Sequence, residues 1–434
     1  MVSELSRLLL YRDMVRAGTI PGDASSLCAR FASGASGPEL TGEVCAFCSR
    51  LIALAEREGF SGNLWQAALA LGLIADENPF SLACEGREEP GGTLSALARQ
   101  DFERLLRCFR YDFSPLLAAA DAAFAGAVLD YRPGAGRAKS AAARLAEALR
   151  DRLSAAADAE EAARTAAEFY RRRGAGAFAL SRAFRAERDG TLSPLRTESA
   201  GLDALVGYET QKRALRTNTE AFLAGRPANN VLLYGDAGTG KSTCVRSLLA
   251  EYPDSLLRVV ELEKSRLDLL PAVAELLGRR RCRFLIFLDD LSFEENETEY
   301  KRLKAAIEGG LSPLPENVLI CATSNRRHLI RETWKDRSDM EHDGDIHRSD
   351  TMEEKLSLSG RFGLRIFFPN PTFEEYHAIV RELAERRGMD PAALREAASA
   401  WQVRAGSRSG RTASQFVDGL SAARAAAHKE KKPD

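Results

Sequence analysis

The sequence predicts an α/β protein in which a parallel sheet, covered by helices on both faces, lies between two helical regions. Within residues 201–369, apolar runs of strand length alternate with helical stretches, which is the pattern of a parallel sheet. One of these runs leads directly into a glycine-rich loop, and a helix-competent segment follows that loop. Before residue 190, apolar residues instead recur at helical spacing. The five expected strands are residues 231–234, 256–262, 284–288, 318–323 and 364–368.

The length of 434 residues and the positions of chain breakers indicate more than one domain. Beyond the last expected strand, Pro369 and Pro371 break the chain, and Thr372 with Glu375 forms a capping box for the helix that follows. The expected order is a helical N-terminal domain (1–190), a linker (191–200), the α/β domain (201–369), a helical lid (370–428) and a disordered tail (429–434).

Composition and charge exclude several classes of protein. The formal net charge is −1, so no global field draws the chain to nucleic acid or to an anionic membrane. No run approaches the roughly 18 apolar residues of a membrane span, and residues 1–14 are expected to form an amphipathic helix rather than a signal peptide. Eight scattered cysteines suit reduced, buried thiols and a cytoplasmic location. Cys45 and Cys48 form a C-x-x-C pair that lacks the other half of a zinc ligand set.

The glycine-rich loop has the pattern G-x-x-x-x-G-K-S over residues 235–242, which is typical of a phosphate-binding loop. Its glycines let successive backbone N–H groups point into one concavity, to which the following helix adds the positive end of its dipole. Lys241 is expected to reach the β- and γ-phosphates, and the hydroxyl of Ser242 to ligate Mg²⁺. The sequence therefore predicts a nucleoside triphosphate and Mg²⁺ as ligands. The residues expected to bind the cofactor here are Asp236, Ala237, Gly238, Thr239, Gly240, Lys241, Ser242 and Thr243.

Polar residues follow two other expected strands. Asp289 and Asp290 end the strand at 284–288, so Asp289 is expected on the metal side and Asp290 beside the attacking water. Asn325 follows the strand at 318–323 and is expected to orient that water near the γ-phosphate. Arg361, just before the last strand, is expected to neutralise transition-state charge across a subunit boundary. Arg411 begins the last helix of the lid.

Together these motifs resemble those of an AAA+ ATPase. The match assigns Walker A to residues 235–242, Walker B to 284–290, sensor 1 to Asn325, the arginine finger to Arg361 and sensor 2 to Arg411. The segment with Val206 and Gly207 resembles the one that packs on adenine in that superfamily.

More narrowly, several strings resemble the bacterial AAA+ ATPases that are grouped as domain-of-unknown-function family 815. These strings are residues 76–83, 178–185, 207–209 with 211–212, 229–235, 288–294, 322–329 and 337–363. The resemblance covers most of the chain. It implies an AAA+ P-loop core with a five-stranded parallel sheet in a three-layer α/β/α arrangement, an all-α domain before it and a helical lid after it. It implies no particular substrate.

Two features depart from the usual AAA+ pattern. Walker B usually ends in Asp-Glu, whereas here Asp290 is one methylene shorter, so water activation is expected to be slow or to draw on Glu294. Protein-threading motors usually carry an aromatic pore loop after the second strand. Residues 261–267 hold no aromatic residue, which argues against threading.

Residues 334–355 contain eight Asp or Glu and four Lys or Arg, with His342 and His347, and are too polar for a core. A solvated loop and a metal site are two interpretations. A third is that the segment packs across a neighbouring subunit and helps to place Arg361. Deletion of residues 339–349 is then expected to lower ATPase activity and to spare nucleotide binding by the monomer.

The sequence is compatible with three alternative functions. The first is a Mg²⁺-dependent ATPase that forms a homo-oligomer and remodels a protein partner bound by the N-terminal domain. The second is a nucleotide-switched loader or regulator of nucleic acid, with phosphate contacts from Arg279, Arg280, Arg281 and Arg283 or from residues 171–173. No base-stacking aromatic residues interleave these clusters. The third is a scaffold that holds ATP without turnover.

Overall fold

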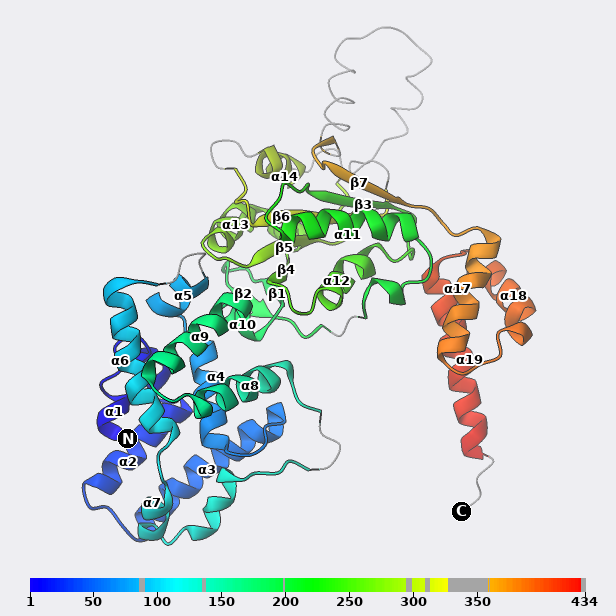
Figure 1. The fold of residues 1–434 in the computed structure, drawn as a ribbon. Helices are drawn as coiled ribbons and strands as arrows, with labels where there is room; N and C mark the ends of the chain where they lie inside the picture. The colour runs from blue at the N-terminus through cyan, green and yellow to red at the C-terminus, as the bar shows by residue number, and fades with distance from the viewer. Residues whose placement is uncertain are drawn as a thin grey trace. The chain divides into compact units, whose positions relative to one another are not determined.

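The structure is a computed structural model that describes residues 1–85, 90–134, 138–197, 200–293, 299–308, 313–326, 358 and 360–430. Figure 1 labels its helices and strands. The contacts divide the chain into two compact units. The first comprises Met1–Arg182 with Arg280–Cys282, and the second comprises Ala183–Arg279 with Arg283–Asp434. None of the described helices is long and apolar enough to cross a membrane.

The first unit is helical, as predicted, and packs around buried aromatic residues that include Tyr11, Trp65 and Phe102. Polar side chains cap the free N–H groups at the start of some of these helices; Asn63, for example, accepts from Gln66 N–H at the start of α4. The elements are α1 (Val2–Leu5), η1 (Arg12–Val15), α2 (Ile20–Ala32), α3 (Pro38–Glu58), α4 (Leu64–Ala75), α5 (Pro79–Glu85), α6 (Gly92–Phe109), α7 (Ser114–Ala119), η2 (Ala123–Leu129), α8 (Ala141–Ala155), α9 (Ala159–Arg173) and α10 (Ala177–Leu180).

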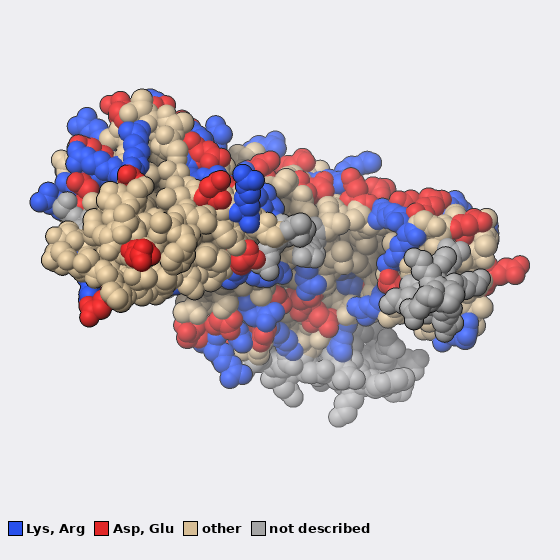
Figure 2. All heavy atoms as spheres, turned by 90° about the horizontal axis from the view of Figure 1, so that it is seen from below, with Lys and Arg blue, Asp and Glu red and all other residues tan. Residues whose placement is uncertain are grey.

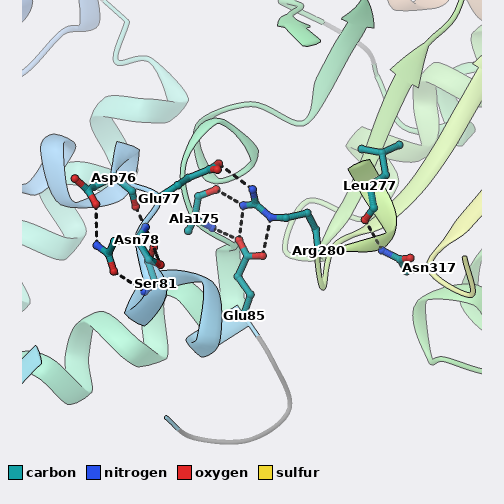
Figure 3. A network of polar contacts seen from close by, with 9 residues as sticks. All are labelled: Asp76, Glu77, Asn78, Ser81, Glu85, Ala175, Leu277, Arg280 and Asn317. Carbon is teal, nitrogen blue, oxygen red and sulfur yellow. Dashed lines mark hydrogen bonds and ion pairs between the residues drawn. The ribbon is translucent and has the colours of Figure 1, made fainter. Parts of the chain in front are cut away.

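A buried polar network in this unit includes Arg280, which the sequence places in a basic cluster (Figure 3). The guanidinium binds Glu85 at two points, with Nε 2.9 Å from Oε2 and Nη2 2.7 Å from Oε1. It also donates to Glu77 and to the carbonyl of Ala175, each at 2.9 Å, and lies over the ring of Phe178. Because the Glu85 side chain is only 3% exposed, this charge pairing satisfies a carboxylate that water hardly reaches.

The second unit contains a seven-stranded sheet in its described part, with the order β2-β1-β4-β5-β6-β3-β7. The pairings are parallel except for the antiparallel pair of β1 and β2. The strands are β1 (Ala183–Ala186), β2 (Leu192–Pro194), β3 (Val231–Gly235), β4 (Leu257–Glu261), β5 (Arg283–Leu288), β6 (Val318–Ser324) and β7 (Leu364–Phe368). The last five are the strands that the sequence predicts.

The first two strands correct the predicted boundary. The sequence places residues up to 190 in the helical domain and 191–200 in a linker, but β1 and β2 join the sheet through β4. The second unit therefore begins at Ala183. Neither strand exceeds four residues, and strand pairing with a distant segment leaves little trace in such a short sequence.

Helices cover both faces of this sheet, as Figure 1 shows for α11 and α12 along one of them. Alternate residues of the strands, such as Val231 and Leu233, pack with Leu215 of α11 and Leu248 of α12. The intervening residues, such as Leu232 and Ile286, are also buried, which is the pattern of a sheet covered on two sides. The helical elements of this part are η3 (Leu202–Ala204), α11 (Glu209–Leu223), α12 (Lys241–Glu251), η4 (Lys264–Leu269), α13 (Leu270–Gly278) and α14 (Glu299–Glu308).

The C-terminal part is the predicted helical segment. It consists of α17 (Phe373–Arg386), η6 (Ala392–Leu394), α18 (Arg395–Ala405) and α19 (Gly410–Glu430). The predicted capping box at the start of α17 is present, with both hydrogen bonds between Thr372 and Glu375. α19 extends past the expected start of the tail at 429, and residues 431–434 lie outside the described part. The predicted fold class, an α/β core with a parallel sheet between helices and a helical region before and after it, is confirmed, with seven described strands in place of five.

Candidate nucleotide-binding site

The glycine-rich loop connects β3 to α12 and encloses a concavity, because its backbone takes conformations that few side chains allow. Gly235 has φ +133°, and a Cβ there would lie 2.1 Å from the carbonyl oxygen of Phe368 on the neighbouring β7. Gly240, at φ +94°, precedes the first residue of α12. The hydroxyl of Thr239 closes the loop by donating to the carbonyl of Asp236 at 2.8 Å. The N-terminus of α12 therefore opens onto the loop, as anion binding requires.

Lys241 points back into this loop. Its Nζ donates to the carbonyls of Gly235 at 2.9 Å and Asp236 at 2.5 Å. The residue is only 5% exposed, and burial lowers the pKa of its amine. A desolvated ammonium group held only by carbonyl oxygens is a strong partner for a phosphate, since a charge-assisted bond replaces bonds to neutral groups.

Ser242 and Asp289 meet at the carboxyl edge of the sheet. The Ser242 hydroxyl donates to Oδ1 of Asp289 at 2.5 Å, and Thr323 donates to the same oxygen at 2.7 Å. The register of β5 and β6 explains the second bond, because Leu288 lies beside Ala322 and the next residues follow side by side. A hydroxyl and a carboxylate are the hard oxygen ligands that Mg²⁺ prefers, so these residues fit the predicted metal site.

Asp290 and Asn325 lie next to this pair. Nδ2 of Asn325 donates to Oδ1 of Asp290 at 2.7 Å, and the N–H of Asp290 donates to the hydroxyl of Thr323 at 2.9 Å. Asp290 has φ +53°, a left-handed conformation that Asp and Asn adopt more readily than longer side chains do. The predicted catalytic acid and the predicted water-orienting amide are therefore direct partners.

A pocket of about 690 Å³ collects most of the predicted residues. The predicted residues that line it are Val206, Ala237, Gly238, Thr239, Gly240, Lys241, Ser242, Thr243, Asp289, Asp290, Asn325 and Arg411. Other residues that line it are Ala204, Leu205, Tyr208, Arg246, Thr323, Ile379, Leu383, Gly410 and Ser414. The C-terminal helices thus close one side of the pocket, and the backbone N–H of Arg411 donates to the carbonyl of Gly238 at 3.1 Å.

Sequence reasoning did not single out Arg246, Thr323, Ile379 and Leu383 as site residues. The sequence does carry features that point to two of them, Arg246 and Thr323. Arg246 lies four residues after Ser242 on a helix, hence on the same helix face. Thr323 ends the strand next to the acidic one. Ile379 and Leu383 have the spacing of an ordinary buried helix face, so the sequence alone does not distinguish them from core residues.

Three predicted residues lie outside the lining of this pocket. Gly207, at φ +81°, forms the turn before α11, and the carboxylate of Asp236 accepts the N–H of Asn370 at 2.9 Å. Arg361 is exposed and lines a different hollow of about 580 Å³, together with Asn230 and Gly363 at the starts of the strands. The alternative acid Glu294 and the polar segment 334–355 lie outside the described residues.

A sequence model of the family described as "Protein of unknown function (DUF815)" matches residues 177–424, more than half of the chain. The chain belongs to this family. The matched range contains every residue that lines the pocket, from Ala204 to Ser414, as well as both short strands at the start of the second unit. The family assignment agrees with the resemblance found in the sequence.

The chain is also similar to solved structures of low sequence identity. The RuvB Holliday junction branch migration motor of Thermotoga maritima is 18% identical, with 50% of this chain and 63% of that chain covered and a TM-score of 0.29. The AAA domain of FIGL-1 in complex with ADP is 17% identical, with 52% and 74% covered and a TM-score of 0.36. The chain thus spans less than two thirds of the RuvB structure. No curated protein matches the sequence of this family member.

Proposed function

We propose that this protein binds ATP with Mg²⁺ in the pocket of the second unit and hydrolyses the bond between the β- and γ-phosphates. The observation that carries the proposal is that Lys241, Ser242 and Asp289 line one pocket at the glycine-rich loop, where Lys241 donates to the loop carbonyl of Gly235 and Ser242 donates to Asp289. Loops of this kind hold phosphates through backbone N–H groups, and a strand-end aspartate beside them serves the metal.

Each residue then has a distinct part. Lys241 neutralises the β- and γ-phosphates, and Ser242 and Asp289 would hold Mg²⁺, which would supply further positive charge to the phosphates. Asp290 takes the proton of the attacking water, and Asn325 fixes the carboxylate of Asp290 through the 2.7 Å bond. Arg411 enters the pocket from the C-terminal helices.

We propose that adenine lies against the apolar residues of the same pocket. Leu205 and Val206 line it from the segment before α11, and Ile379 and Leu383 line it from α17. Flat aromatic ligands bind in clefts lined mainly by hydrophobic side chains, with a few polar groups that set orientation. The pocket combines apolar side chains with the loop, and Leu205 lies against the loop, where a Cβ at Gly240 would be 2.6 Å from its Cδ1.

We propose further that Arg361 acts on the nucleotide of a neighbouring copy in a homo-oligomer, since it is exposed and does not line the pocket of its own chain. The helical first unit is then the proposed binding region for the protein that the ATPase remodels.

The nucleic-acid alternative receives less support. One of its two basic clusters contains Arg280, yet this guanidinium is paired with Glu85 and Glu77 and only 9% exposed. On the face drawn in Figure 2, basic and acidic side chains of the described residues are interspersed. Phosphate backbones are instead held by clustered basic side chains.

ATP turnover as a function of protein concentration tests the proposal, with wild type, Lys241→Ala and Arg361→Ala measured together. We expect specific activity to rise with concentration in the wild type, and Arg361→Ala to lose this rise while it still binds ATP. Lys241→Ala is expected to weaken ATP binding. Tight ATP binding without turnover at any protein concentration would overturn the proposed ATPase activity and favour the alternative of a scaffold that holds ATP.

A further inference from the structure

Arg246 lies at the metal side of the pocket, where the sequence pattern predicts no cation other than Mg²⁺. Its Nη2 is 3.1 Å from Oδ2 of Asp289, and the guanidinium lies 5.7 Å from the ring centroid of Phe287. Lys241, the cation that the loop pattern does predict, turns instead toward the carbonyls of the loop. Asp289 therefore already has a cationic partner within the protein.

Periodicity explains this placement. Ser242 and Arg246 are four residues apart on α12 and share one face of the helix. Phe287 and Asp289 are two residues apart at the end of β5 and share one side of the strand. Because this face of α12 packs on this side of β5, Ser242 and Arg246 both reach the carboxylate of Asp289, and each binds a different oxygen.

The two oxygens of Asp289 consequently have separate partners. Oδ1 accepts from the hydroxyls of Ser242 and Thr323, whereas Oδ2 faces Arg246. We propose that Arg246 is a positioning residue that competes with Mg²⁺ for the carboxylate of Asp289, and thereby sets the magnesium concentration at which nucleotide binds. The proposal rests on the proposed function, because it concerns the metal of that same site.

Two opposing effects decide whether removal of the Arg246 guanidinium strengthens or weakens magnesium binding. Arg246 helps to orient Asp289, but both side chains are partly exposed, 47% and 29%, and an ion pair of this kind contributes little. The two hydroxyls on Oδ1 hold the carboxylate without it. Repulsion between the guanidinium and a divalent cation held by the same carboxylate would be stronger, since it would act on a double charge. Loss of the guanidinium is therefore expected to favour magnesium.

The test is a titration of MgCl₂ at constant ionic strength, with the affinity of the full chain for fluorescent N-methylanthraniloyl-ADP as the readout. Arg246→Gln is expected to lower the half-maximal Mg²⁺ concentration about five- to tenfold. Arg246→Lys keeps the charge and should stay within about twofold of wild type. Arg279→Gln is the matched control, because Arg279 is 73% exposed and pairs with Glu275 on the surface at 2.7 Å. We expect no shift for it.

A double-mutant cycle with Asp289→Asn separates competition at the carboxylate from a merely structural role. With the amide in place, Arg246 is no longer held beside the metal, so Arg246→Gln should change the Mg²⁺ requirement by less than about twofold. An unchanged or raised Mg²⁺ requirement in Arg246→Gln overturns the inference while the proposed function stands. Equal shifts for the Gln and Lys variants also overturn it, because charge is then not the cause. If wild type binds no nucleotide at any Mg²⁺ concentration, the proposed function itself fails.

Discussion

Arg280 and Glu85 form a buried, two-point ion pair, with Nε–Oε2 and Nη2–Oε1 distances of 2.9 and 2.7 Å. Such a pair is weak evidence for a net gain in stability, yet the loss of one partner leaves a buried charge uncompensated. Glu77 and the carbonyl of Ala175 share the same guanidinium, so several groups lose their partner at once when it is removed.

We therefore predict that Arg280→Ala lowers the unfolding free energy of the first unit by about 3–5 kcal/mol. Arg279→Ala, at the exposed neighbouring position, should cost less than about 1 kcal/mol. Urea unfolding followed by the fluorescence of Trp65 measures the difference, in a background where Trp334 and Trp401 are replaced by Phe, so that Trp65 in the core of this unit is the emitter. Equal losses for the two variants would show that the pair does not support this unit.

Asp290 and Asn325 allow a prediction about the chemical step. Asp290→Asn removes the proposed base and should lower ATP turnover about 10²-fold or more, with Mg²⁺–ATP affinity within a few-fold of wild type. Asn325→Ala leaves the base but releases its Oδ1, so a smaller loss, about tenfold, is expected. Steady-state turnover and equilibrium binding on the same preparations separate the two effects. Wild-type turnover in Asp290→Asn would assign the base to another residue.

Lys241 allows a prediction about binding. Charge-assisted hydrogen bonds contribute about 1.5–3 kcal/mol, so Lys241→Ala should weaken ATP binding by about tenfold to a hundredfold. Isothermal titration calorimetry measures the affinity directly. Arg226→Ala serves as a control, since Arg226 lines the hollow that includes Arg361 and not the nucleotide pocket. Retained affinity in Lys241→Ala would place the phosphates elsewhere.

The cysteines allow a prediction about thiol reactivity. All eight lie among the described residues, and Cys45 is exposed whereas the other seven are buried. Burial raises the pKa of Cys48 to about 11 and the pKa values of Cys108 and Cys244 to about 12. The thiolate is the reactive form, so these groups stay protonated and unreactive near pH 8.

We accordingly expect Ellman's reagent to label about one thiol per native chain at pH 8, and none in Cys45→Ser. In denaturant the count should rise to eight in wild type and seven in the variant. Rapid labelling of several thiols in the native protein would contradict the buried positions. If neither Cys45 nor Cys48 is labelled in the denatured wild type, the two form a disulfide.

Much of the nucleotide site follows from the sequence, because its parts are local. The loop around Lys241 needs glycines at a set spacing, and Asp289 needs only an apolar strand directly before it. The capping box of Thr372 and Glu375 is likewise a contact between residues three apart. Patterns of this kind are complete within a short stretch of chain, so the stretch itself predicts the structure.

What the sequence by itself determined is therefore the order of strands and helices, the phosphate-binding loop and the acids that follow it. Tertiary structure alone decided that β1 and β2 extend the sheet, that Arg280 is buried on Glu85 rather than solvated, and that Arg246 shares Asp289 with Ser242. The physical reason is the same in each case. A charged side chain or a strand of a few residues takes its environment from segments far along the chain, and only their packing decides which partner it meets.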